Sequence, residues 1–224
     1  MQIKPIAYIK TDFKEKFGIP RQSGRSPSSI GKIVFTPEFS SREAVRGIED
    51  FSHIWLIFGF SEAEYKTFSP TVRPPRLGGN RRVGVFATRS PYRPNSLGLS
   101  SVKLISVEKE KGKIFLIVSG VDLLNNTPIY DIKPYLPQTD CHIGAKGSYS
   151  DENWEHKLNV NFSQNLLKIV PIEKQNALLE CLSDDPRPSY QDNGRNYHMR
   201  FANYDISFKV EDKTLTVIGI KEDV

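Results

Sequence analysis

Short apolar runs, each bounded by glycine, proline, asparagine or serine, follow one another through the first part of this chain. Runs of this kind predict β-strands, and seven candidates occur, over residues 3–10, 32–36, 54–60, 82–88, 97–107, 113–119 and 129–132. Several short strands with short connections favour a sandwich or a closed barrel. One short helix is expected at 41–47, because Ser40 and Glu43 have capping-box spacing and Gly47 can end a helix.

A polar stretch without periodicity, residues 137–156, separates this part from the rest of the chain. We therefore expect a first domain over residues 1–140 and a second over 155–224. In the second, a strand is predicted at 157–162. A helix begun by Pro171 should bury one face, formed by Ile172, Leu178, Leu179 and Leu182. Further strands at 196–201, 204–210 and 214–220 make this domain a small α+β unit.

Hydrophobic residues make up 38 % of the 224 residues, which is enough for real cores. The longest uninterrupted apolar run, residues 54–60, is far shorter than the ~20 residues that a membrane helix needs. Lys4, Lys10 and Asp12 interrupt the apolar stretch that a secretory signal would require near the start. The cytoplasm is therefore the expected location.

The cysteines give no sign of a metal centre. Cys141 and Cys181 lack CxxC spacing, so they predict neither a disulfide framework nor a zinc site. A metal held by Cys141, His142 and a distant partner is the less favoured alternative to an exposed pair. No metal is expected.

Positive charge is concentrated in one segment. No acidic residue lies between Glu64 and Glu108, whereas eight basic residues do, which we call the basic window: Lys66, Arg73, Arg76, Arg81, Arg82, Arg89, Arg93 and Lys103. The whole chain carries +5, so the remainder sums to 5 − 8 = −3. Neighbouring prolines place these residues on loops. Arginine suits phosphate, which favours RNA over a small phosphorylated ligand; the alternative is a solvated face paired with acids from elsewhere in the fold.

Five ordered segments closely resemble the bacterial TsaA-like, or TrmO, family, at residues 14–24, 44–60, 70–95, 121–137 and 184–190. The resemblance implies a mainly β fold, with a β-barrel catalytic domain and a small α+β C-terminal domain. It also implies a homodimeric tRNA methyltransferase with its cofactor pocket near the subunit interface. Such an enzyme uses S-adenosylmethionine to methylate N6 of threonylcarbamoyladenosine, the modified purine immediately 3′ of the anticodon.

Carried over residue by residue, the family's cofactor contacts correspond to Ser23, Gly24, Arg25, Ser61, Glu62, Arg89, Leu99, Ser119, Gly120, Val121 and Asp122. The glycines would let backbone approach the ligand, and Leu99 offers an apolar wall for adenine. The alternative is that Gly24 and Gly120 are ordinary turn residues and that Leu99 lies in the core.

Charged members of this set have separate expected roles. Arg89 could hold the methionine carboxylate, while Asp122 or Glu62 could face the ribose hydroxyls or the sulfonium. The alternative for Arg89 is one more surface cation. The family commonly has proline where Ser23 stands and often histidine where Ser61 stands, which puts the Ser61 contact in doubt.

Chemistry at N6 points to Asp131, Lys133 and Tyr135. The nitrogen belongs to a urea-like group, so loss of its proton should assist methylation. Asp131 could accept that proton, Lys133 could hold the threonyl carboxylate or a phosphate, and Tyr135 could stack on or hydrogen-bond the base. Alternatively, Asp131 and Lys133 are a solvated pair and Tyr135 is a packing residue.

The tRNA partner should be contacted by Arg76, Arg81, Arg82 and Arg93, and in the second domain by Arg187 and Tyr190. A structural turn is the alternative for Arg187 and Tyr190. Two other functions stay open on the residues alone. One is a non-enzymatic RNA-binding barrel, and the other is an enzyme acting on a small phosphorylated metabolite.

Overall fold

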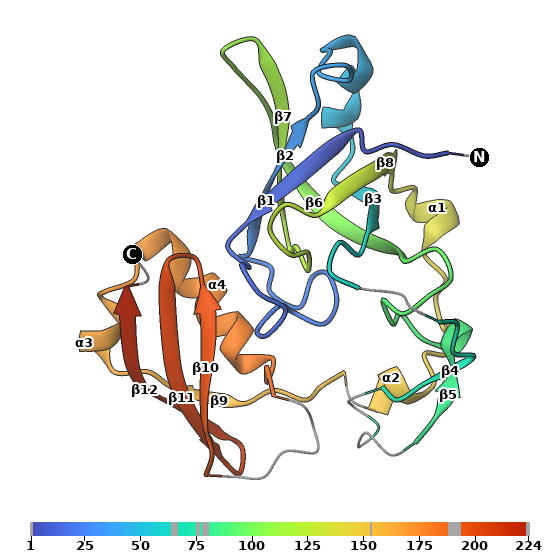
Figure 1. Ribbon diagram of the computed structural model, residues 1–224. Coiled ribbons are helices and arrows are strands. Elements are labelled where there is room, and N and C mark those ends of the chain that lie inside the picture. Colours follow the sequence, from blue (N-terminus) through green and yellow to red (C-terminus); the bar gives the residue numbers. More distant parts are fainter. Residues whose placement is uncertain are drawn as a thin grey trace.

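The computed structural model describes residues 2–63, 67–74, 77, 81–152, 154–187 and 194–222, so the predicted RNA contacts Arg76 and Tyr190 lie outside the described residues. Its first part is a closed six-stranded barrel (Figure 1). In spatial order the strands are β1 (Ala7–Thr11), β2 (Ile30–Phe35), β7 (Lys113–Ser119), β6 (Leu97–Glu110), β3 (His53–Gly59) and β8 (Pro128–Pro134), which returns to β1.

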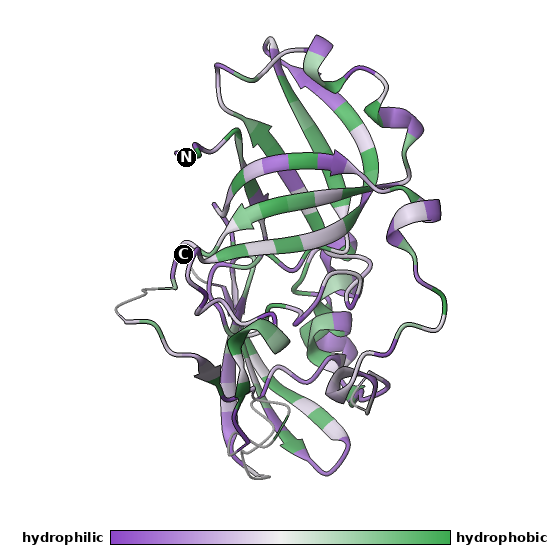
Figure 2. Ribbon diagram, turned by 90° about the vertical axis from the view of Figure 1, so that its right-hand side faces the viewer, coloured by the Kyte–Doolittle hydropathy of each residue, from purple (hydrophilic) through white to green (hydrophobic). Residues whose placement is uncertain are grey.

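The strands form where hydrophobic residues alternate with less apolar ones, as the banded colouring of Figure 2 shows. In β3, Ile54, Leu56 and Phe58 are buried inside the barrel. His53 and Trp55 alternate with them on the outer face and are half-buried. This arrangement confirms the mainly β prediction and decides for a barrel over a sandwich.

Residues 82–88 were expected as a barrel strand, and this prediction is wrong. Only β5 (Val83–Gly84) is extended there, and it pairs with β4 (Thr71–Val72) outside the barrel. A 3-10 turn, η4 (Val85–Ala87), follows. The guanidinium of Arg93 and the hydroxyl of Thr88 both donate to the carbonyl of Val85, which stabilises the turn against extension.

The expected helix at 41–47 is also corrected. Two 3-10 turns, η1 (Glu43–Val45) and η2 (Ile48–Asp50), flank Gly47, whose φ is +82°. The capping box does not form, because the hydroxyl of Ser40 accepts from the backbone N–H of Ile114 at the start of β7 instead. A long-range hydrogen bond has displaced the local cap.

The second domain is a four-stranded sheet in the order β10 (Asn196–Phe201), β11 (Tyr204–Glu211), β12 (Thr214–Glu222) and β9 (Asn159–Asn161). Only the β12–β9 pair is parallel. Three short helices accompany this sheet. In the chain, α1 (Pro137–Asp140) and α2 (Tyr149–Glu152) precede β9, and α3 (Gln164–Leu167) follows it. The barrel and this sheet together confirm the predicted fold class.

The main helix, α4 (Ile172–Ser183), lies between this sheet and the barrel (Figure 1). Its buried residues are Ala177, Leu178, Cys181 and Leu182. The predicted face was partly wrong: Ile172 is 78 % exposed, because with 3.6 residues per turn its position lies on the opposite side of the helix from that stripe. No helix in the described ranges is long and apolar enough to cross a membrane.

Both domains share one hydrophobic core. The ring of Phe13, after β1, lies edge-on to Phe201 with centroids 6.0 Å apart. Phe17 stacks with Tyr197 at 6.4 Å and with Phe208 at 6.3 Å. The segment after β1 is therefore held by the second domain.

Gly18 tests this packing. Its φ is +91°, and a Cβ there would lie 2.2 Å from the sulfur of buried Met199. We expect Gly18→Ala to lose about 1–2 kcal/mol from the left-handed backbone and a further ~1–3 kcal/mol from overpacking. Urea unfolding measures both.

The matched control is Gly112→Ala, where φ is +81° and no atom lies within 4 Å of the added Cβ. It should lose only the backbone contribution. Equal losses in the two variants would contradict the packing explanation.

Candidate active site

Two predicted cofactor loops lie against each other at one end of the barrel. The backbone N–H of Gly24 donates to the carbonyl of Gly120 at 2.9 Å. Both glycines have left-handed φ values, +78° and +75°, and a Cβ on Gly120 would lie 3.3 Å from the backbone of Gly24. A side chain at Gly120 would push the two loops apart, whereas a Cβ at Gly24 would meet no atom within 4 Å. The glycines are turn residues that also permit a close backbone approach.

Asp122 follows the second of these loops. Its Oδ1 is buried and has no hydrogen-bond partner among the described residues. Burial raises the pKa of this carboxyl to about 6, although the Ser100 hydroxyl, the backbone of Ser23 and the charge of Arg89 act in the opposite direction. An orphaned carboxylate oxygen of this kind suits a hydroxyl or cationic ligand group.

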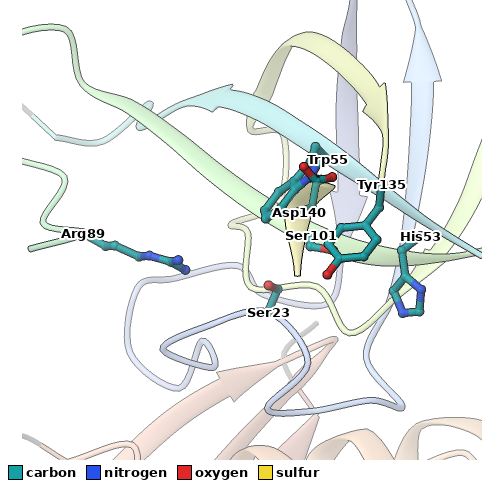
Figure 3. A pocket seen from close by; sticks show the side chains of 7 residues that line it. All are labelled: Ser23, His53, Trp55, Arg89, Ser101, Tyr135 and Asp140. Atoms are coloured by element: carbon teal, nitrogen blue, oxygen red, sulfur yellow. Dashed lines mark hydrogen bonds between the residues drawn. The ribbon is translucent and has the colours of Figure 1, made fainter. Parts of the chain in front are cut away.

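A cavity of about 430 Å³ opens beside these loops (Figure 3). Its lining residues are Ser23, His53, Trp55, Arg89, Ser101, Tyr135 and Asp140. The cavity brings together two predicted cofactor residues, Ser23 and Arg89, and the predicted catalytic residue Tyr135. The Arg89 guanidinium also donates to the side-chain oxygen of Gln22.

Strand pairing explains why distant residues meet here. Trp55 of β3 pairs with Lys133 of β8 on one side and with Ser101 of β6 on the other. All three positions lie on the outer face, because the alternate residues are inside the barrel. Leu99, two residues before Ser101, is 50 % exposed, which excludes the alternative of a core leucine.

Four cavity residues were not predicted: His53, Trp55, Ser101 and Asp140. The indole N–H of Trp55 donates to Asp140 Oδ2 at 2.8 Å, and the backbone N–H of Leu136 donates to the same oxygen at 2.9 Å. These bonds hold the pKa of Asp140 below its ordinary value, with the Leu136 bond contributing most. The sequence offered one signal for two of these residues. His53 and Trp55 are aromatic side chains two positions apart, at the start of the strand predicted at 54–60, and both point outward.

Tyr135 completes an aromatic wall. Its ring centroid lies 5.6 Å from Trp55 and 6.1 Å from His53. Desolvation, together with Cys141 and Asp140, raises the pKa of Tyr135 above its ordinary value. The phenol is therefore protonated near neutral pH and can donate a hydrogen bond, but it is a poor base.

The other predicted cofactor residues take different positions. Ser61 lines a second cavity, of about 490 Å³, together with Leu97 and Tyr130. Leu97 precedes Leu99 by two residues on the same strand, so the outer face of β6 connects the two cavities. Glu62 is exposed and lies 3.6 Å from the ammonium of Lys16.

Three members of the predicted cofactor set face the protein interior. Arg25 is 5 % exposed and donates to Asp184 Oδ1 at 2.6 Å. Val121 lies in the core, and Ser119 is buried. None of the three lines either of the two cavities.

Asp131 and Lys133 form an exposed ion pair, with 3.1 Å between Oδ2 and Nζ. This fits the solvated-pair alternative. Both nevertheless lie on β8, whose Lys133 pairs with cavity residue Trp55. Neither residue lines the cavity itself.

The described part of the basic window is not paired with carboxylates. Among the residues that the structure describes, no carboxylate forms an ion pair with Arg73, Arg81, Arg82, Arg89, Arg93 or Lys103. Arg82 donates to the Thr71 hydroxyl at 3.0 Å. The alternative of pairing with acids elsewhere is therefore not seen in the described part of the window.

Two predicted RNA contacts are engaged by their own loops. Arg93 donates to the carbonyls of Val85 and Thr88, at 3.2 and 2.7 Å. Arg187, 10 % exposed at its side chain, forms a two-pronged pair with Asp185 at 2.9 and 3.1 Å. Arg187 thus fits the structural-turn alternative.

Comparison with known proteins supplies the family. Residues 8–141 match the model of the tRNA-methyltransferase O N-terminal domain, and residues 155–223 match that of the TrmO C-terminal domain. The chain belongs to the tRNA-methyltransferase O family. The resemblance found in the sequence is confirmed.

Several relatives align over most of the chain. A protein of Escherichia coli (strain K12) named tRNA (adenine(37)-N6)-methyltransferase is 37 % identical over 98 % of this chain and 97 % of its own length. A putative S-adenosylmethionine-dependent methyltransferase of Pseudomonas aeruginosa is 39 % identical over 91 % of this chain and 90 % of its own. The crystal structure of TrmO from that organism superposes with a TM-score of 0.80 at 32 % identity, covering 99 % of this chain and 97 % of that one.

Because its carboxyl is buried, Asp122 should lower the stability of the folded protein by an amount that depends on pH. Its folded pKa of about 6 exceeds the ordinary 3.8, so the wild type should lose stability as pH rises from about 4 through about 6. Asp122→Asn, which cannot ionise, should be more stable by up to about 3 kcal/mol near pH 7.5 and by less than ~1 kcal/mol near pH 4. Thermal unfolding at the two pH values measures the difference. A stability gain that does not change with pH would refute the assignment.

Proposed function

We propose that this chain is an S-adenosylmethionine-dependent methyltransferase acting on N6 of threonylcarbamoyladenosine beside the anticodon of tRNA. Family membership and the printed names of the relatives support the reaction class. The observation that carries the proposal is the cavity in which Arg89, Ser23 and Tyr135 meet, next to the orphaned carboxylate of Asp122. The proposal assigns residues 1–140 to the methyltransferase domain and 155–224 to a C-terminal domain that helps to contact tRNA.

The proposed donor site has a distinct chemical role for each group. Arg89 supplies a planar fork for the methionine carboxylate. Asp122 faces the ribose hydroxyls or the sulfonium charge, and the exposed Leu99 provides an apolar wall for adenine. Gly24 and Gly120 keep the adjoining backbone close. When bound, S-adenosylmethionine supplies a methyl group on a positively charged sulfur.

Orientation is the main contribution that this chain can make. Holding the nitrogen in line with the sulfur–methyl bond can supply about 7–11 kcal/mol in favourable systems. Trp55 and Tyr135 form the aromatic wall on which a purine can stack. The protonated phenol of Tyr135 can donate to the base.

The N6 proton needs an acceptor. Asp131 remains the proposed one, since it lies on the strand beside the cavity, where its carboxylate pairs with Lys133. Lys133 then has the threonyl carboxylate or a phosphate as its proposed partner. This assignment extends the sequence-based prediction and needs a direct test by single-turnover kinetics of Asp131→Asn.

We further propose a cytoplasmic homodimer. The cytoplasm follows from the proposed tRNA substrate. The dimer is supported by exposed apolar side chains on the outer face of β6, where Leu99 and Ile105 are each 50 % exposed. A partner subunit covering this face would lie next to the donor site, as the family resemblance implies.

Paired tRNA substrates test the reaction. The purified protein should transfer a labelled methyl group from S-adenosylmethionine to tRNA carrying threonylcarbamoyladenosine, and not to the same tRNA lacking the threonylcarbamoyl group. Calorimetry should show saturable donor binding. Donor binding without any tRNA methylation would contradict the proposed substrate, and absence of both would favour the non-enzymatic RNA-binding alternative.

The basic window should contribute the electrostatic part of tRNA binding. With about four phosphate contacts, the log–log salt slope should be near −3, at ~0.7 per contact. Replacing Arg81 and Arg82 together by glutamine should reduce its magnitude by about 1.4. Filter binding over a salt series measures the slope.

A double control removes two exposed lysines from the β6–β7 hairpin, Lys109→Gln with Lys113→Gln. This hairpin projects away from the basic loops in Figure 1. The control should keep the wild-type slope. A wild-type slope near zero, or the same reduction in both double variants, would rule out the window as the binding face.

A further inference from the structure

The last part of the connection between β1 and β2, residues 21–29 and here called the β1–β2 loop, lies against the C-terminal end of α4. Two carboxylates face it, Glu180 in the last turn of the helix and Asp184 at its C-cap. Residues four apart lie on one face of a helix, so both side chains point the same way. The second domain therefore presents two acidic side chains to a loop of the barrel.

Glu180 binds the middle of the loop through both oxygens. Its Oε2 accepts from the backbone N–H of Ser28 at 2.8 Å and from the Ser26 hydroxyl at 3.0 Å. Its Oε1 accepts from the Ser28 hydroxyl at 2.8 Å. Hydrogen bonds to an ionised acceptor are roughly twice as strong as neutral ones. One carboxylate thus takes the place of the strand pairing that this segment lacks.

Asp184 holds the preceding part of the loop. The Arg25 guanidinium donates to Oδ1, and both side chains of this ion pair are only 4 % exposed. The same guanidinium donates to the carbonyls of Trp154 and His156 and lies 4.9 Å from the Trp154 ring centroid. A buried cation with this many acceptors has little freedom to move.

The opposite side of the same loop forms the candidate donor site. Ser23 lines the cavity, and the N–H of Gly24 donates to the carbonyl of Gly120. Ser29 accepts from the N–H of Gly120 at 2.9 Å. The side-chain oxygen of Gln22 accepts from Arg89. Any shift of the loop would therefore move Ser23, Gly24 and the partner of Arg89 together.

We propose that Glu180 is a positioning residue for the methyl donor, through which the second domain holds the β1–β2 loop in its donor-binding shape. The inference rests on the proposed function, because it takes the cavity to be the donor site. Among the described residues, Glu180 forms no hydrogen bond with a residue that lines the cavity, and it acts through Ser26 and Ser28. Its loss lowers the fraction of molecules with a competent loop, and apparent donor affinity falls by the same factor.

Steady-state kinetics on the full-length protein tests the proposal. For Glu180→Gln we expect the KM for S-adenosylmethionine to rise about tenfold. At saturating donor, kcat should stay within about twofold of wild type, and the KM for tRNA should not change. A protein that is merely less stable would instead show a lower apparent kcat with both KM values unchanged, because the molecules that remain folded bind normally. Calorimetric titration with S-adenosylmethionine, without tRNA, should show the same weakening.

Glu173→Gln is the matched control, since Glu173 is an exposed glutamate in the first turn of the same helix. It should behave as wild type. Ser28→Ala removes the other partner of one bond, should raise the donor KM by about threefold, and should add little to Glu180→Gln in the double variant.

The outcomes separate the two claims. A wild-type protein that binds no S-adenosylmethionine would overturn the proposed function and this inference with it. Normal donor binding in the wild type with an unchanged donor KM in Glu180→Gln would overturn only the inference. If Glu180→Gln fails to fold by circular dichroism, Ser28→Ala decides alone, and a wild-type donor KM in that variant would overturn the proposal.

Discussion

The buried ion pair between Arg25 and Asp184 is the constraint on which the arrangement of this molecule depends. A guanidinium removed from water is strongly destabilising unless it is paired and fully hydrogen-bonded, and Asp184, Trp154 and His156 together meet that need. Three of the four participants come from beyond the barrel. The β1–β2 loop can therefore take its observed shape only when the second domain is in place, which makes the barrel, the loop and α4 one structural unit.

The candidate active site is built from outward-facing strand residues and loop residues that do not belong to the hydrophobic core. Inward residues of β3 close the barrel, while the outward residues His53 and Trp55 stay half-buried and form part of the cavity wall. Loops with left-handed glycines bring Gly24 and Gly120 to the barrel end. Asp122, two residues after Gly120, keeps an oxygen that has no hydrogen-bond partner among the described residues, at a cost in stability. Under the proposed function, a ligand group would supply the partner that this oxygen lacks.

Local sequence patterns predicted most strands, because period-two burial depends only on which side chains the chain carries in order. They failed where distant groups intervened. At 82–88 the Arg93 guanidinium holds a turn that propensity alone would extend, and at 41–47 the Ser40 hydroxyl bonds to Ile114 instead of capping a helix. Arg25 was grouped with the cofactor residues by its place in a motif, whereas its side chain serves the domain interface. His53 and Trp55 showed only the weak signal of two aromatic side chains on one strand. Ser101 and Asp140 could not be predicted, because strand register brings Ser101 to the cavity and a hydrogen bond from Trp55 holds Asp140 of α1 there.

The amino-acid order by itself determined most of the strands, the concentration of positive charge and the family, since each depends on residues that are neighbours along the chain. Only the tertiary structure decided which side chains share a cavity, that Leu99 is exposed, that Asp131 and Lys133 are paired, and that Glu180 reaches the β1–β2 loop across about 150 residues. These facts follow from closure of the barrel and docking of α4, which are long-range events driven by burial of a common core.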